Sequence, residues 1–311
     1  MVRVAVIGDV MLDAYYHCDV IGFSPEDDLA PKLAVRSKSY KPGGAANVAC
    51  CLSKWGSEVG LFGVCGNDFS CETLSNILRR EALERVYLYP IVGRPTTCKT
   101  RVVTPQSRQA VRVDEECSKD VDSKVGETLQ QALSDFHPAI VVVSDYAKGV
   151  VTSGLMRFLT EQLSGDVLVV VDPKTPNLGF YRRVFAITPN EHEFAAFKGT
   201  DVDPRCEATH LVVTQGSKGS VVLKGNLTEN FRVPVRARAV GDPAGCGDAY
   251  VAALVQGMCI RNTFREACLL ASAAGALAFD MMGVACPKWE QIEEELTYPE
   301  YKMKETLDAQ G

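Results

Sequence analysis

The chain has 311 residues, of which 46% are hydrophobic and 23% charged, and its formal net charge is -6. This is the composition of a globular protein, and the length allows one large α/β domain or a core with a small accessory. An acidic chain has no excess positive charge for nucleic acid or an anionic membrane, so we expect neither as a partner. No apolar run approaches the roughly 20 residues of a membrane helix, and the N-terminus has the pattern of a strand rather than a signal peptide. We therefore expect a cytoplasmic protein.

The 12 cysteines form no C-x-x-C pair, so neither a zinc ribbon nor a thioredoxin-type site is indicated. Cys50 and Cys51 lie in an apolar run, and Cys259 and Cys268 lie in segments with the pattern of buried helices. A free cysteine in a reducing compartment behaves as a small hydrophobic residue. We predict that role for the cysteines of this chain.

Short apolar runs alternate with helical patterns along the chain. Strands are indicated at residues 2–7, 59–64, 140–143, 168–171, 184–188 and 211–214. Helices are indicated at residues 45–55, 69–80 and, rich in alanine, 245–278. Strands that are apolar throughout and separated by helices favour a parallel sheet covered on both faces. We predict an α/β fold with a mostly parallel central sheet, in a single domain over residues 1–311.

Two segments break this alternation. Residues 13–40 are rich in turn signals, and residues 86–114 have the pattern of several strands with no helix between them. We predict that the two segments pair with each other as a small β lid beside the core. Because ligands of open α/β sheets bind beyond the carboxyl ends of the strands, a lid there would exclude water from the chemistry.

The strongest local signal is the sequence GDPAGCGD from Gly241 to Asp248, which runs directly into a predicted helix. A glycine-rich turn at a helix N-terminus leaves backbone N–H groups free to bind an anion, and phosphoryl transfer needs such a site. Asp248 lies where a carboxylate could take the proton of an attacking hydroxyl. The local sequence supports equally well the alternative that Asp248 only caps its helix.

Two further motifs lie near the N-terminus. In KPGGAANVA, residues 41–49, paired glycines allow a ligand to approach the backbone, and Asn47 can hydrogen-bond sugar hydroxyls. In GDVMLD, residues 8–13, Asp9 and Asp13 stand at the carboxyl end of a strand, where Asp can bind sugar hydroxyls. A tight strand-to-helix turn and ordinary turn chemistry are the plainer explanations.

Two motifs in the second half of the chain suit a nucleotide. In TPNEHE, residues 188–193, Asn190 and Glu193 share one face at a helix start and offer the oxygen ligands that Mg²⁺ prefers. The spacing alone favours the alternative of a capping box. In VTQGSKG, residues 213–219, a strand, a glycine turn and a second strand form a surface against which a nucleotide could lie.

Basic residues gather in the predicted lid at Lys99, Arg101, Arg108 and Arg112. Lys99 and Arg101 alternate onto one strand face, where the guanidinium group suits a phosphate. In an acidic chain this local excess of positive charge indicates a phosphorylated substrate. The alternative is a solvated strand edge, where Lys and Arg discourage aggregation.

In their order along the chain, the motifs resemble those of the ribokinase (PfkB) family of sugar kinases. The segments that carry the resemblance are Gly43-Gly44 with Asn47, Asp242 to Asp248, residues 188–193 and residues 213–216. The resemblance covers residues 2–285. It implies an ATP-dependent carbohydrate kinase with a ribokinase-like three-layer sandwich, a mostly parallel central sheet and a small β lid.

Within the family, several strings are most similar to the subfamily of heptose 7-phosphate kinases. They are VIGDVMLD, SPE, PGGAANVA, SDYAKG and DPK at residues 6–13, 24–26, 42–49, 144–149 and 172–174, together with residues 99–116. This resemblance implies transfer of the terminal phosphoryl group of ATP to the anomeric hydroxyl of a heptose 7-phosphate, which gives a 1,7-bisphosphate.

The resemblance also implies roles for individual residues. Asp248 would be the catalytic base, and the backbone of Gly245, Cys246 and Gly247 would form the anion hole. The substrate-binding residues would be Asp13, Gly43, Gly44, Asn47, Lys99, Arg101 and Arg112. Asn190 and Glu193 would serve Mg²⁺ and ATP, and Lys174, Thr214 and Gly216 would bind the nucleotide. In some relatives a monovalent cation activates the loop around Asp242, so such a cation stays open here. Relatives often dimerise through the lid, which implies a homodimer.

Four features depart from the family pattern. Pro243 replaces the usual Thr, and Cys246 replaces the usual Ala. The segment at residues 197–210 is shorter than in the family pattern, with a helix missing on the nucleotide side. No nucleotidyltransferase half follows, so another protein would have to activate the product. Two alternatives stay open: a PfkB kinase for another sugar, sugar phosphate or nucleoside, and a non-catalytic regulator that binds nucleotide or sugar on the same scaffold.

Overall fold

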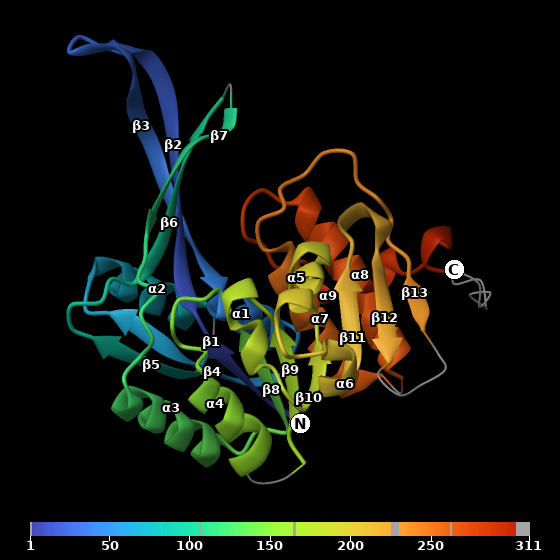
Figure 1. Cartoon of the computed structure of the whole chain (residues 1–311). Helices are drawn as coiled ribbons and strands as arrows, with labels where there is room; N and C mark the ends of the chain where they lie inside the picture. The colour runs from blue at the N-terminus through green and yellow to red at the C-terminus, as the bar shows by residue number, and fades with distance from the viewer. Residues whose placement is uncertain are drawn as a thin grey trace.

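The apolar runs predicted as strands form one nine-stranded sheet in a computed structural model, which describes residues 2–81, 83–105, 107–163, 166–224, 230–261 and 263–302 (Figure 1). Neighbouring strands from β11 to β5 pair in parallel, whereas β12 and β13 are added antiparallel. In spatial order the strands are β13 (Phe231–Val233), β12 (Ser220–Lys224), β11 (Ala208–Thr214), β10 (Val184–Ile187), β9 (Leu168–Asp172), β8 (Ile140–Ser144), β1 (Arg3–Gly8), β4 (Glu58–Gly66) and β5 (Arg85–Ile91).

Helices cover both faces of this sheet. Because side chains alternate across a strand, Val4 and Val6 of β1 pack with α1, α7 and α8, whereas Ala5 and Ile7 pack with α3 and α4. The predicted three-layer α/β sandwich is therefore confirmed. The helices are α1 (Ala45–Lys54), α2 (Phe69–Arg80), α3 (Ser123–Phe136), α4 (Ser153–Arg157), α5 (Glu191–Ala196), α6 (Pro204–Glu207), α7 (Cys246–Ile260), α8 (Phe264–Asp280) and α9 (Trp289–Glu295). Within the segment at residues 197–210, which is shorter than in the family pattern, α6 is a helix of a single turn.

Four long strands form a second sheet, named here the projecting sheet, which rises away from the large sheet in Figure 1. Its spatial order is β3 (Asp27–Gly44), β2 (Val10–Ser24), β6 (Thr97–Thr104) and β7 (Ser107–Glu115). The predicted lid boundary at residue 86 is wrong, because β5 pairs in parallel with β4 of the large sheet. Tyr87 of β5 stacks there on Phe62, with ring centroids 4.6 Å apart.

The prediction of free cysteines is wrong for one pair. Cys65, at the end of β4, and Cys71, in the first turn of α2, form a disulfide. The other cysteines of the described segments are free, and burial raises the pKa of Cys50 to about 12. A buried thiol that stays protonated behaves as the predicted small hydrophobic residue.

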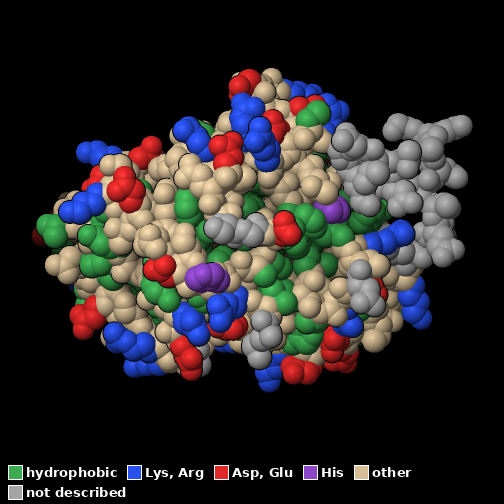
Figure 2. Space-filling model, turned by 90° about the horizontal axis from the view of Figure 1, so that it is seen from below, with side chains coloured by type: hydrophobic (Ala, Val, Ile, Leu, Met, Phe, Trp, Pro, Cys, Tyr) green, Lys and Arg blue, Asp and Glu red, His purple; other side chains and the backbone are tan. Residues whose placement is uncertain are grey.

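Acidic and basic side chains are interspersed on the face of the molecule that Figure 2 shows. None of the described helices is long and apolar enough to cross a membrane.

Candidate active site

The N-terminus of α7 lies at the centre of the candidate site. Gly245 precedes the helix with φ 80°, a left-handed conformation that other residues rarely adopt. Among the described residues, the N–H groups of Gly245 and Gly247 meet no acceptor, whereas the N–H of Cys246 is 3.3 Å from the carbonyl oxygen of Pro243. Two of the three N–H groups predicted as an anion hole are thus open, at the positive end of a long helix.

The carboxylate of Asp248 does not cap α7. It is buried and accepts two hydrogen bonds from distant segments, one from Asn47 Nδ2 at 3.0 Å and one from the Tyr146 hydroxyl at 2.7 Å. Burial raises the pKa of Asp248 to about 6, and the hydrogen bonds from Tyr146 and Asn47 oppose this rise. A carboxylate with a pKa close to neutral is suited to act as a general base.

The glycine pair brings Asn47 to Asp248. Gly43 and Gly44 end β3, and α1 follows at once with Asn47 in its first turn. Gly44 has φ 56°, and a Cβ there would lie 2.5 Å from the carbonyl oxygen of Asp9. Only glycine fits this turn, which places the amide of Asn47 against the carboxylate of Asp248.

One face of the projecting sheet lies over the site. The pairing of β2, β6 and β7 sets Asp13, Lys99 and Asp114 in one row and Tyr15, Arg101 and Arg112 in the next. The Tyr15 hydroxyl accepts a hydrogen bond from the N–H of Val284 at 3.0 Å, and the Lys99 ammonium lies 4.9 Å from the ring centroid of Tyr146. The basic residues predicted to bind phosphate therefore lie on the sheet face that is turned toward Tyr146 and Val284.

Acidic neighbours neutralise two of these basic side chains. Arg101 forms an ion pair with the buried Asp13, and Arg112 forms two hydrogen bonds of 2.8 and 2.6 Å to Asp114. Lys99 has no ion pair among the described residues, and burial lowers its pKa. Of these three basic side chains, Lys99 can thus meet a substrate anion without breaking an ion pair. The side chain of Arg108 lies outside the described residues.

A cavity of about 380 Å³ lies between the projecting sheet and the loops that precede α7 and follow α8. Tyr15, Arg101 and Gln109 line it from the sheet, and Asp242 and Met281 line it from the loops. The cavity gives a small polar molecule room beside the basic face.

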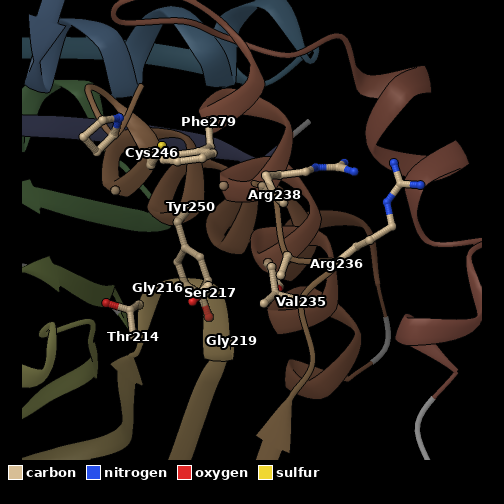
Figure 3. Close-up of a pocket in the computed structure, with 16 residues that line it drawn as sticks. Thr214, Gly216, Ser217, Gly219, Val235, Arg236, Arg238, Cys246, Tyr250 and Phe279 are labelled. Carbon is tan, nitrogen blue, oxygen red and sulfur yellow. The ribbon is translucent and has the colours of Figure 1, made fainter. Parts of the chain in front are cut away.

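A second cavity, of about 280 Å³, lies beside the start of α7 (Figure 3). Cys246 and Gly247 line it from α7, and Thr214 and Gly216, for which nucleotide binding is predicted, line it from the turn after β11. Tyr250 points toward that turn, and its hydroxyl lies 2.8 Å from Ser220 Oγ. The first turn of α7 therefore separates this cavity from Asp248, which faces Asn47.

Asn190 and Glu193 form the capping box that their spacing favours. Asn190 Oδ1 accepts the N–H groups of His192 and Glu193, and Glu193 Oε2 accepts the N–H of Asn190 at 3.1 Å. The other oxygen of Glu193 lies 3.4 Å from Lys174 Nζ. The side-chain oxygens of both residues therefore already have partners within the chain.

Comparison with known proteins identifies the family of this chain. The sequence profile described as pfkB family carbohydrate kinase matches residues 1–291. The chain belongs to this family. It is a carbohydrate kinase, and membership of this family implies the use of ATP.

Two curated relatives of this PfkB kinase are named bifunctional protein HldE. The relative from Shewanella sediminis is 31% identical over 91% of this chain, and that from Salmonella arizonae is 31% identical over 93%. The chain spans 61% and 62% of the length of these two relatives.

Solved structures share the fold. Ribokinase from Thermotoga maritima has a TM-score of 0.73 at 18% identity, and the comparison covers 96% of this chain and 100% of that one. Phosphofructokinase-2 from Escherichia coli in complex with potassium has a TM-score of 0.76 at 18% identity, covering 96% and 99%.

The structure adds two residues that the motifs did not assign. Tyr146 follows β8 and its hydroxyl donates a hydrogen bond to Asp248, and Asp172 ends β9. Burial raises the pKa of Asp172 well above its usual value, and the nearby charges of Asp248 and Glu193 raise it further. Both residues stand at the carboxyl ends of predicted strands, which is the signal that could have found them.

Asp9 has a different role from that expected of it. Its buried carboxylate accepts the N–H groups of Tyr146, Lys148 and Val150 at 2.8, 3.0 and 3.3 Å. Asp9 therefore holds the loop after β8 in place, and its oxygens are not directed at a sugar.

Proposed function

We propose that this PfkB kinase transfers the terminal phosphoryl group of ATP to the anomeric hydroxyl of a heptose 7-phosphate. The observation that carries the proposal is the position of Lys99. Among the described residues this cation has no ion pair, and it lies on the same sheet face as Arg101 and close to Asp248, the proposed base. A neutral sugar would leave the Lys99 ammonium without an anionic partner. The strings shared with heptose 7-phosphate kinases, and relatives named HldE over the matched 61% of their length, support the same substrate.

The reaction divides between the two cavities. ATP would lie in the cavity lined by Thr214 and Gly216, with its terminal phosphoryl group at the open N–H groups of Gly245 and Gly247. The sugar would lie on the other side of α7, between Asp248 and the projecting sheet. There Asp248 would take the proton of the attacking hydroxyl, and the donors at the helix end would stabilise the charge on the transferred group.

The sugar-binding residues would come from the two N-terminal motifs. Asp13 and Asn47 would hydrogen-bond hydroxyls, while Gly43 and Gly44 would let the sugar approach the backbone. Arg101 and Arg112 would join Lys99 at the phosphate, because a doubly charged phosphate can compete with Asp13 and Asp114 for them.

Mg²⁺ fits the negative charge between β9 and α5. Asp172 lies near the carboxylates of both Asp248 and Glu193, and Lys174 is the cation that pairs with Glu193. Asn190 and Glu193 would hold the ion through water, since the described residues contain no group of three or more His, Cys, Asp or Glu side chains placed as metal ligands. When bound, Mg²⁺ would neutralise the charge of the phosphates.

Two further parts of the proposal concern a cation and assembly. Asp242 anchors the loop before α7, accepting the N–H groups of Ala244 at 3.0 Å and Gly283 at 2.9 Å, and a monovalent cation would act on this loop. A solved structure of Escherichia coli phosphofructokinase-2, which shares the fold, is a complex with potassium. Exposed apolar side chains on the projecting sheet, such as Phe23 and Val113, support a homodimer that would cover them.

The test is ATP consumption with heptose 7-phosphate, sedoheptulose 7-phosphate, fructose 6-phosphate, ribose and adenosine. We expect turnover with heptose 7-phosphate alone, and a loss of about 10²- to 10⁴-fold in Asp248→Asn. Asp135→Asn makes the same chemical change on the exposed face of α3 and should match the wild type. Turnover with another sugar would overturn the substrate. Absence of turnover in a folded protein that Mg-ATP stabilises thermally would favour the non-catalytic alternative.

A further inference from the structure

Tyr146 lies in the loop that joins β8 to α4, within the string SDYAKG of residues 144–149. The carboxylate of Asp9 fixes this loop through three N–H groups, one of which belongs to Tyr146 itself. The next residue, Ala147, has φ 55°, a left-handed conformation that costs a non-glycine residue free energy. The loop is therefore held in one strained shape that fixes the direction of the Tyr146 side chain.

The side chain of Tyr146 connects the two halves of the candidate site. Its hydroxyl donates to Asp248 Oδ1 at 2.7 Å, and its ring lies under the Lys99 ammonium at 4.9 Å from the centroid. A Cβ at residue 44 would lie 3.3 Å from Tyr146 Cε2, so Gly44 also makes room for this ring. One side chain thus contacts the base and the cation proposed for the substrate phosphate.

We propose that Tyr146 is a positioning residue for phosphoryl transfer, whose hydroxyl holds the carboxylate of Asp248 in its ionised, proton-accepting form. The inference rests on the proposed role of Asp248 as the base. Asp248 alone accepts the proton of the sugar hydroxyl. Tyr146 keeps its own proton throughout, because burial raises the pKa of Tyr146 well above its usual value.

The physical reason is the balance of groups around Asp248. Burial favours its neutral form, whereas hydrogen bonds donated to a carboxylate favour the ionised form. Asn47 Nδ2 donates to one oxygen and the Tyr146 hydroxyl to the other, so loss of either bond shifts the balance toward protonation. The charged and titratable groups that face Asp248 are Asp13 of β2, Cys51 of α1, Lys99 of β6, Tyr146, Asp172 of β9 and Cys246 of α7.

The test is the pH profile of kcat/KM for Tyr146→Phe, with whichever sugar the wild type turns over. Phenylalanine keeps the ring under Lys99 and removes only the hydroxyl. We expect the acidic limb of the profile to move up by about one to two pH units, because a hydrogen bond to a charged group is lost. Activity below the limb should fall about 10- to 100-fold, and most of it should return above pH 8.

Tyr181→Phe is the matched control. The Tyr181 hydroxyl donates to Asp145 Oδ2 at 2.5 Å, and burial raises the pKa of Asp145 to about 6, so this carboxylate has a pKa in the same range as Asp248 without contacting it. We expect the control to keep the limb of the wild type. An equal loss at every pH in Tyr146→Phe would assign a merely structural role and overturn the inference.

Failure of the two proposals can be told apart with Asp248→Asn. If that variant loses turnover while the profile of Tyr146→Phe coincides with the wild type, only the role of Tyr146 is overturned. If Asp248→Asn keeps full turnover, the base is another group and both proposals fall.

Discussion

Gly43 faces the carboxylate of Asp13 so closely that a Cβ at residue 43 would lie 1.9 Å from Asp13 Oδ2. Asp13 has no room to retreat, since it is 1% exposed and pairs with Arg101. Glycine is required here because of the neighbouring side chain, whereas at Gly44 it is required by a positive φ as well. The first family signature therefore shapes the place proposed for the sugar.

Gly43→Ala should displace the Asp13 carboxylate and break its ion pair with Arg101. We expect KM for the sugar to rise about tenfold or more, because a charge-assisted contact is lost, while KM for ATP changes little. Steady-state kinetics with each substrate varied in turn measures both constants. The control is Gly126→Ala in α3, where a Cβ meets nothing within 4 Å. That change should stabilise the fold by about 0.5–1 kcal/mol and leave both KM values unchanged. A Gly43→Ala enzyme with the KM values of the wild type would contradict the close approach.

Lys99→Met should separate recognition of the substrate phosphate from catalysis. Methionine keeps an apolar stem over Tyr146 but removes the ammonium group. We expect KM for a phosphorylated sugar to rise about 10- to 100-fold, and KM for the same sugar without its phosphate to change little. Arg112→Met is the comparison, and its effect should be smaller because Arg112 is half-exposed and paired with Asp114. Equal effects of Lys99→Met on both sugars would show that Lys99 does not bind the phosphate.

Local signals predicted the helices and buried strands well. The helix predicted at residues 69–80 has those bounds, because Asp68 accepts the N–H of Cys71 and so fixes the start of α2. The apolar run 168–171 forms most of β9, because four β-branched or leucine residues suit a strand that is covered on both faces. Neither feature depends on distant parts of the chain.

Distant pairing decided what local pattern left open. β5 alternates exposed and half-buried residues, and this pattern suits the edge of either sheet, so its pairing with β4 was not predictable. The basic excess in the projecting sheet was predicted, but its neutralisation by Asp13 and Asp114 follows from strand register. Asn47 and Asp248 are 201 positions apart, so only the family resemblance connected them.

The carboxyl group of Asp172 should make the protein without bound nucleotide or divalent cation less stable as the pH rises. Its pKa is raised by burial and then by the charges of Asp248 and Glu193, so the folded chain holds this proton to a higher pH than the unfolded chain, where the pKa is about 3.9. The contribution of a raised carboxyl pKa to stability is present below the unfolded pKa and is lost as the pH rises through the folded pKa. Asp172→Asn is neutral at every pH, so we expect it to raise Tm, slightly near pH 4 and increasingly toward pH 8.

Thermal unfolding of both proteins across this pH range, without nucleotide or divalent cation, measures the difference in Tm. Asp135→Asn is the control, because its exposed carboxylate has no comparable desolvation and should give no pH-dependent difference. If the difference between wild type and Asp172→Asn stayed constant with pH, the proton on Asp172 would not be linked to folding. If the difference in Tm grows with pH and Asp172→Asn also loses turnover, the charge of Asp172 destabilises the ligand-free protein and is retained because the reaction needs it.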